Sequence, residues 1–225
     1  MTGSTPTAVG FIPAAPLLVP QVAGGSASLD DELRDACRDV ARRLSESADE
    51  IVVAAAVGDG GRWTDEATWG FEGFGVDRRP ADARPRVPWQ LGIGGWLLDD
   101  VGWKGPRRYV DIAPEHSADV DLSARSAVLV VGDASARRNE KAPGHLDDRA
   151  APFDAAIARA VATGDVTALG SLDAPLAAEL MCTGAQAWRW LATAIGGQRV
   201  VAAELLADTA PYGVGYLVGY WRLAQ

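Results

Sequence analysis

The chain has 225 residues, 48% of them hydrophobic and 23% charged, which suits one compact domain. Thirty acidic residues against 21 basic ones give a formal net charge of -9. This balance argues against a nucleic-acid partner, because phosphate backbones are bound by clustered lysines and arginines. The N-terminal segment has no basic region before an apolar run, and no uninterrupted apolar stretch reaches membrane-spanning length, so we expect a cytoplasmic protein without a membrane partner.

Strands and helices alternate in the first half of the chain. A short apolar run at Thr7–Ile12 predicts a strand, and Ser28–Ser47 places apolar residues at helical spacing. Continuous apolar runs at Glu50–Val57 and Ser126–Asp133 are typical of strands that helices cover on both faces. We therefore expect these two strands in the middle of a sheet.

Residues 58–103 interrupt this alternation with an irregular excursion rich in Trp, Gly and Pro, which ends in a predicted helix over 89–102. The excursion begins with the glycine-rich VGDGG, but the remaining residues of a phosphate-binding loop do not follow it. Its aromatic residues either cover the domain core or form a surface through which copies of the chain associate as a homo-oligomer. Five of the eight tryptophans lie here, namely Trp63, Trp69, Trp89, Trp96 and Trp103.

The second half of the chain continues with three predicted helices and two strands. The helices are expected near Pro152–Ala162, Leu172–Leu180 and Ala185–Ile195, and the strands at Arg199–Leu206 and Val214–Trp221. The alternation predicts the α/β class, as a single three-layer α/β/α domain over residues 1–225.

Several motifs resemble one known superfamily. They are FIPAAPLLVP, DEIVVAAAVGDG, much of the segment from Gly132 to Gly184, and the terminal PYGVGYLV. Together they are similar to the class III extradiol ring-cleavage dioxygenase B-subunit superfamily, which also includes Memo-like proteins. The resemblance spans most of the chain but not the Trp-rich excursion. It implies an α/β/α fold around a central mixed sheet, with a metal-binding cleft at the strand ends.

The sequence departs from this superfamily at the positions of three histidines. Ala14 stands where active members have an iron-ligating histidine, and Val57 or a neighbour stands where they have the second. In GDASA, Ala136 replaces the histidine that serves as acid and base. Extradiol cleavage needs two histidines and a carboxylate on the metal, and the two histidines of the chain, His116 and His145, lie outside the ligand positions. The sequence thus predicts no catalytic residue, no metal and no cofactor.

Two functions follow from these departures. The first is a non-catalytic relative of the dioxygenases, acting as a protein-interaction module or binding a small anionic or aromatic ligand. The alternative is a metal-dependent, ring-opening oxidoreductase with atypical ligands for Fe(II) or another divalent metal. Carboxylates would then hold the metal. The candidates are Asp59, Asp133, Asp148 and Glu204, and the resemblance implies that Glu204 is the remnant of the family's carboxylate ligand.

The candidate cleft centres on the loop after the strand at Ser126–Asp133. Asp133 and Ser135 leave that strand at the sheet edge, where α/β proteins bind ligands. Nearby arginines and a histidine could donate to a carboxylate or a phenolate, although a hydrogen-bonded loop network is the other interpretation. The predicted ligand-binding residues are Ala14, Asp59, Asp133, Ser135, Arg137, Arg138, His145 and Glu204.

Overall fold

The computed structural model describes residues 6–24, 31–58, 60–76, 84–113, 120, 122, 125–195 and 197–224. Two short 3-10 helices, η1 (Pro16–Leu18) and η2 (Glu72–Phe74), accompany the α-helices and strands. The other elements, in chain order, are β1 (Ala8–Ile12), α1 (Pro20–Ala23), α2 (Asp31–Ser47), β2 (Glu50–Ala55), β3 (Arg62–Trp63), α3 (Trp89–Asp100), β4 (Arg107–Asp111), β5 (Ser126–Val131), α4 (Ala150–Thr163), α5 (Val166–Gly170), α6 (Ala174–Glu179), α7 (Ala185–Ala194), β6 (Val200–Thr209) and β7 (Tyr216–Leu223).

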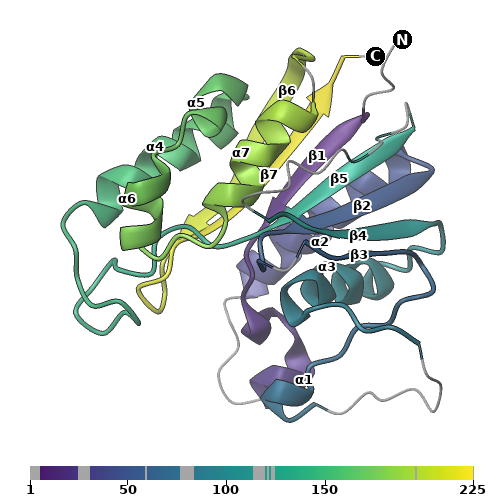
Figure 1. The fold of residues 1–225 in the computed structure, drawn as a ribbon, viewed down its shortest axis with the longest axis horizontal. Helices are drawn as coiled ribbons and strands as arrows, with labels where there is room; N and C mark the ends of the chain where they lie inside the picture. Colours follow the sequence, from purple (N-terminus) through teal and green to yellow (C-terminus); the bar gives the residue numbers. More distant parts are fainter. Residues whose placement is uncertain are drawn as a thin grey trace.

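The strands form one mixed seven-stranded sheet in the order β3-β4-β2-β5-β1-β7-β6 (Figure 1). β4, β2, β5 and β1 are parallel to one another, whereas β3 runs antiparallel to β4 and β7 runs antiparallel to β1. β6 pairs antiparallel with β7 at the other edge. The mixed sheet and the central places of β2 and β5 confirm the predicted fold class. β5 lies between β1 and β2, so the loops after these three strands leave the same edge.

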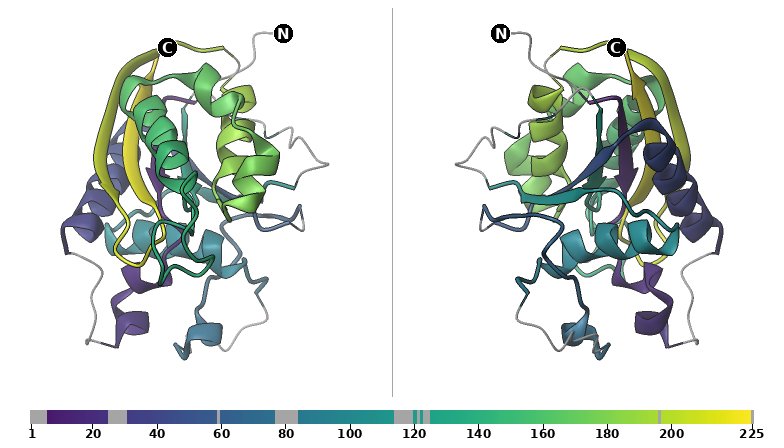
Figure 2. Two further views of the ribbon diagram at one scale, coloured as in Figure 1. Left: turned by 90° about the vertical axis from the view of Figure 1, so that its left-hand side faces the viewer. Right: turned by 90° about the vertical axis from the view of Figure 1, so that its right-hand side faces the viewer.

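Helices cover both faces of the sheet, as the alternation of apolar residues requires (Figure 2). In β5, Ala127, Leu129 and Val131 join the core beneath α2 and α3, while Val128 and Val130 join the core beneath α4 to α7. Cys37 and Cys182 are buried on opposite sides of the sheet. No helix among the described residues is long and apolar enough to span a membrane.

The Trp-rich excursion folds onto the core under α2 and α3. Trp69 and Trp96 are buried in that core, and Trp63, Trp89 and Trp103 pack against it. This supports the interpretation of the excursion as a cover, and self-association through it stays a prediction. α3 begins at Trp89 as predicted and ends at Asp100, two residues before the expected boundary.

Two strands were absent from the sequence-based prediction. β4 is short, and its two arginines interrupt the apolar pattern that predicts a buried strand. In the fold, Arg107 pairs with Asp99 and Arg108 pairs with Glu50. β3 is a two-residue strand inside the excursion. In addition, the expected helix at 172–180 is α6, and the shorter α5 precedes it.

The backbone at the end of β5 lies in direct contact with the backbone at the start of α7. A Cβ atom added to Gly132 would lie 2.4 Å from the Cα atom of Gly184. The N–H of Gly184 also donates to the carbonyl of Asp133, at 2.8 Å. Side chains are excluded from this crossing, which fixes α7 against the sheet edge where the loops emerge.

Candidate functional site

Two cavities lie at the sheet edge formed by the ends of β1, β2 and β5. The smaller one has a volume of about 70 Å³, and its lining includes Ala14, Ala55, Trp89, Gln90, Asp133 and Thr183. Ala14 follows β1, Ala55 ends β2 and Asp133 follows β5. The structure therefore brings Ala14 and Asp133 together, because adjacent parallel strands share one carboxyl edge.

The larger cavity has a volume of about 360 Å³ and a predominantly apolar wall. It shares Asp133 and Thr183 with the smaller cavity, so both cavities border these two residues. Ala136, whose N–H donates to the carbonyl of Leu180, lines only the larger one. Its other apolar lining residues include Pro143, Ala178, Met181 and Val214.

Asp133 is the polar centre of both cavities. Its Oδ1 accepts the N–H of Ala14 at 2.7 Å, and its own N–H donates to Thr183 Oγ1 at 3.0 Å. Its Oδ2 has no hydrogen-bond partner among the described residues. Burial raises the pKa of this carboxyl group from 3.8 to about 7, although the Ala14 N–H opposes that shift. A donor that reaches Oδ2 would stabilise the ionised form.

Ser135 and Arg138 do not face these cavities. Ser135 is fully buried, and both its N–H and its hydroxyl donate to the carboxylate of Asp154, at 2.9 and 2.8 Å. Arg138 donates to the same carboxylate from Nη1, at 3.0 Å. Asp154 is 1% exposed, so Arg138 supplies the charge that a buried carboxylate needs. These contacts follow the loop-network interpretation.

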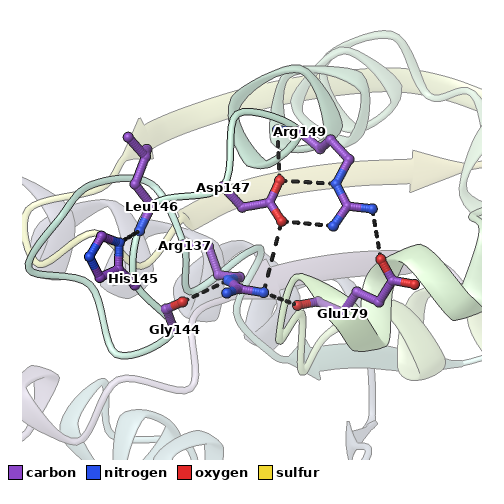
Figure 3. Close-up of polar contacts among 7 residues, drawn as sticks. All are labelled: Arg137, Gly144, His145, Leu146, Asp147, Arg149 and Glu179. Carbon is purple, nitrogen blue, oxygen red and sulfur yellow. Dashed lines mark hydrogen bonds and ion pairs between the residues drawn. The ribbon is translucent and has the colours of Figure 1, made fainter.

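Arg137 belongs to a second network, which joins the loop after β5 to α6 (Figure 3). It donates from Nε to the carbonyl of Gly144 at 2.7 Å and from Nη1 to that of Glu179 at 3.0 Å. Arg149 pairs with Asp147 at 2.8 Å and with Glu179 at 2.7 Å. The hydrogen bonds from Arg149 lower the pKa of Asp147 to about 2. Arg137 is thus occupied within the fold.

His145 lies on the exposed part of the same loop. Its side chain is 69% exposed, and its Nδ1 accepts the N–H of Leu146 at 2.7 Å (Figure 3). Its Nε2 lies 3.2 Å from the carboxylate of Glu140, which is itself exposed. His145 adopts a left-handed backbone conformation with φ 60°, typical of a turn. It lines neither cavity.

Glu204 lies away from the sheet edge. It pairs in register with Tyr220 on β7, which in turn pairs with Gly10 in the middle of β1. Its carboxylate contacts the guanidinium of Arg43 on α2 at 2.6 Å. The structure therefore does not place Glu204 beside Asp133. Asp59, another predicted cleft residue, lies outside the described residues.

The residues at the cavities do not fit an Fe(II) centre. Such a centre needs two imidazoles and a carboxylate, whereas Ala14 and Ala136 offer no lone pair and Asp133 is a single carboxylate. Within the described ranges, no group of three or more His, Cys, Asp or Glu side chains could hold a metal ion. His116 and Asp59 fall outside those ranges.

Asp111 is a structural residue that the sequence analysis missed. It ends β4, is 2% exposed and accepts the N–H groups of Val57, Gly58 and Gly60 at 2.6, 3.1 and 2.8 Å. Gly58 and Gly60 have positive φ values of 120° and 71°, which turn these donors towards one point. The glycine-rich VGDGG was the sequence signal for a loop whose N–H groups bind an anion. In the fold, that anion is the carboxylate of Asp111.

The comparisons with known proteins leave the family open. No protein-family model matches the chain, and no curated protein sequence matches it. The fold and the site define the protein as a three-layer α/β/α protein with a carboxylate-centred pair of cavities at the sheet edge. The resemblance to the extradiol dioxygenase superfamily stays a prediction based on the motifs.

Proposed function

We propose that this protein is a non-catalytic relative of the extradiol ring-cleavage dioxygenases, which binds a small aromatic molecule at the sheet edge. One observation carries the proposal. Asp133 lies between an apolar cavity of about 360 Å³ and a smaller one of about 70 Å³, and Ala14 and Ala136 occupy the expected histidine positions. A cleft at the expected sheet edge, without the imidazoles that the chemistry requires, supports the proposal.

The size and the lining of the larger cavity suit an aromatic ring. Apolar cavities of about 150 Å³ already bind benzene. Met181 gives the wall an adaptable side chain, and Ala136 and Ala178 leave room for a flat ligand. Burial of a ring's apolar surface is favourable, but the free-energy cost of association offsets much of that gain. We therefore expect weak binding of simple ring compounds.

The anionic part of the ligand hypothesis has less support. Arg137 and Arg138 were the expected anion-binding groups, but in the fold Arg137 donates to two carbonyls and Arg138 to Asp154. The charged side chain that lines the cavities is Asp133, which repels an anion when it is ionised. The metal-dependent alternative also lacks support, because the described residues provide no suitable set of donors.

Ligand-observed NMR with benzyl alcohol tests the proposal, because this method detects millimolar binding. Ala136→Phe fills the larger cavity and should abolish saturation transfer to the ring protons. The matched control Ala155→Phe places the same ring on the exposed surface of α4 and should bind as the original chain does. Equal binding to both variants would place the ligand elsewhere and refute the proposal, provided that circular dichroism shows both to be folded.

A further inference from the structure

We propose that the ligand of this site is a small aromatic amine, whose primary ammonium group enters the smaller cavity between Asp133 and Gln90. The inference rests on the proposed function and names the class of ligand for the same site. The larger cavity would hold the ring, and the smaller one would hold the cation. Both cavities share Asp133 and Thr183, so the linker between the ring and the ammonium group must pass these two residues.

Gln90 supplies the first argument. It lies in the first turn of α3 and lines the smaller cavity, and its Oε1 is buried without a hydrogen-bond partner among the described residues. Buried polar atoms are nearly always satisfied, so an unpaired acceptor on a residue that lines the cavity favours a ligand that brings a donor. An ammonium group carries three donors and no acceptor.

Asp133 supplies the second argument. Its Oδ1 is held by the Ala14 N–H, while Oδ2 has no partner in the part of the chain that the structure describes. Among the described residues that line the two cavities, Asp133 is the only charged side chain. A cation would therefore neutralise a carboxylate that burial otherwise disfavours, and a charge-assisted hydrogen bond would hold it in place.

Trp89 completes the surroundings of the cation. It lines the same small cavity, and its ring packs edge to face against Phe74, with the centroids 5.3 Å apart. Aromatic faces attract ammonium groups, most strongly for tryptophan. The N-terminal turn of α3 acts in the opposite direction, since its N–H dipoles favour anions. A neutral and an anionic ligand of the same shape must therefore be compared with the amine.

Three ring compounds differ in this one group: benzylamine, benzyl alcohol and benzoate. Their Kd values are measured by NMR titration of the protein at about pH 8, above the pKa of about 7 for Asp133. We expect benzylamine to bind about tenfold more tightly than the other two, as one charge-assisted hydrogen bond predicts. Asp133→Asn keeps an acceptor for the Ala14 N–H but removes the charge, and should abolish this preference.

Two further variants sharpen the test. Gln90→Met keeps the length of the side chain without the acceptor and should weaken benzylamine about threefold. Glu66→Gln removes an equal charge from an exposed position outside both cavities and should change nothing. Equal or tighter binding of benzyl alcohol or benzoate, or an amine preference that survives Asp133→Asn, overturns the amine proposal and leaves the aromatic site standing. Binding of none of the three compounds overturns the proposed function as well.

Discussion

Asp111 and Asp133 are two aspartates at the same edge of the sheet with opposite environments. Asp111 ends β4 and accepts three backbone N–H groups from the loop after β2. Asp133 follows β5 and accepts one, from Ala14. The first carboxylate fills a glycine-rich loop that could otherwise bind an anion, and the second faces two cavities. The number of internal donors thus separates a carboxylate that holds the fold from one that is available to a ligand.

The largest effect should come from Asp111→Ala, which leaves at least three partly buried N–H groups without their acceptor. At about 1 to 3 kcal/mol for each unsatisfied group, we expect a loss of roughly 3 kcal/mol or more in the free energy of unfolding. Urea denaturation measures it. The control Asp133→Ala is compared at about pH 5, where Asp133 is still protonated; it frees one N–H and should cost about 1 kcal/mol. Similar losses for the two variants would contradict the distinction between the two aspartates.

The second-largest effect should be the contribution of Asp133 to the pH dependence of stability. Burial raises its pKa from 3.8 to about 7, so its contribution to stability is complete below about pH 4 and is lost as the pH rises through 7. Asp133→Asn cannot ionise. Its stability relative to the original chain should therefore increase by on the order of 2 kcal/mol between pH 4 and pH 8, less than the full linkage because the side chain is partly exposed.

Two buried neighbours of Asp133 should not obscure this profile. Burial raises the pKa of Cys182 to about 12, and burial together with Asp133 raises the pKa of Tyr216 well above its ordinary value. Both groups therefore stay neutral between pH 4 and pH 8. Urea denaturation of the two proteins at several pH values makes the comparison, and parallel profiles would show that Asp133 does not titrate in this range.

A smaller effect is expected at the exposed network of the loop after β5. Arg149→Ala removes the partner that lowers the pKa of Asp147 to about 2, so NMR titration should find that pKa closer to its ordinary value. The thermal midpoint should fall by no more than about 3 °C, because the Arg149 side chain is 53% exposed. Arg159→Ala, on the exposed side of α4, is the matched control. A drop that persists in high salt would refute the assignment to surface ion pairs.

We expect that added iron produces no ring-cleavage activity. Protein loaded with Fe(II) under anaerobic conditions should consume no oxygen with protocatechuate or simple catechols, because Ala14 and Ala136 cannot act as ligand or base. Oxygen uptake and the absorbance of the ring-opened product measure this. Turnover that rises with iron content would sink the non-catalytic assignment and favour the metal-dependent alternative.

The sequence predicted those parts of the molecule that depend on apolar pattern. β1, β2 and β5 are continuous apolar runs, and their carboxyl ends share an edge because parallel neighbours must. This rule for parallel strands is sufficient to predict that Ala14, after β1, and Asp133, after β5, lie close together. β4 was not predicted because two of its five residues are arginines. Their charges are paired with Asp99 and Glu50, which lie in other elements.

The direction in which each polar side chain points could not be predicted from the apolar pattern of the sequence. Ser135 and Arg138 turn inward because Asp154, on α4, reaches them from 19 and 16 residues away. Asp111 finds the N–H of Val57 at a separation of 54 residues. The position of Glu204 depends on the register of β6, which two irregularities shift. Each of these partners is set by tertiary packing, so a single sequence does not reveal it.

The crossing of Gly132 and Gly184 makes this site a convenient scaffold for engineering. Main-chain atoms close the joint between β5 and α7, so the exchange of side chains in the cavity wall removes none of the atoms that form it. Ala136, Ala178 and Met181 can be exchanged for residues of other sizes to build receptors for a series of ligands. The two glycines themselves are the positions that such a library must hold constant, since any Cβ at Gly132 would drive the helix off the sheet.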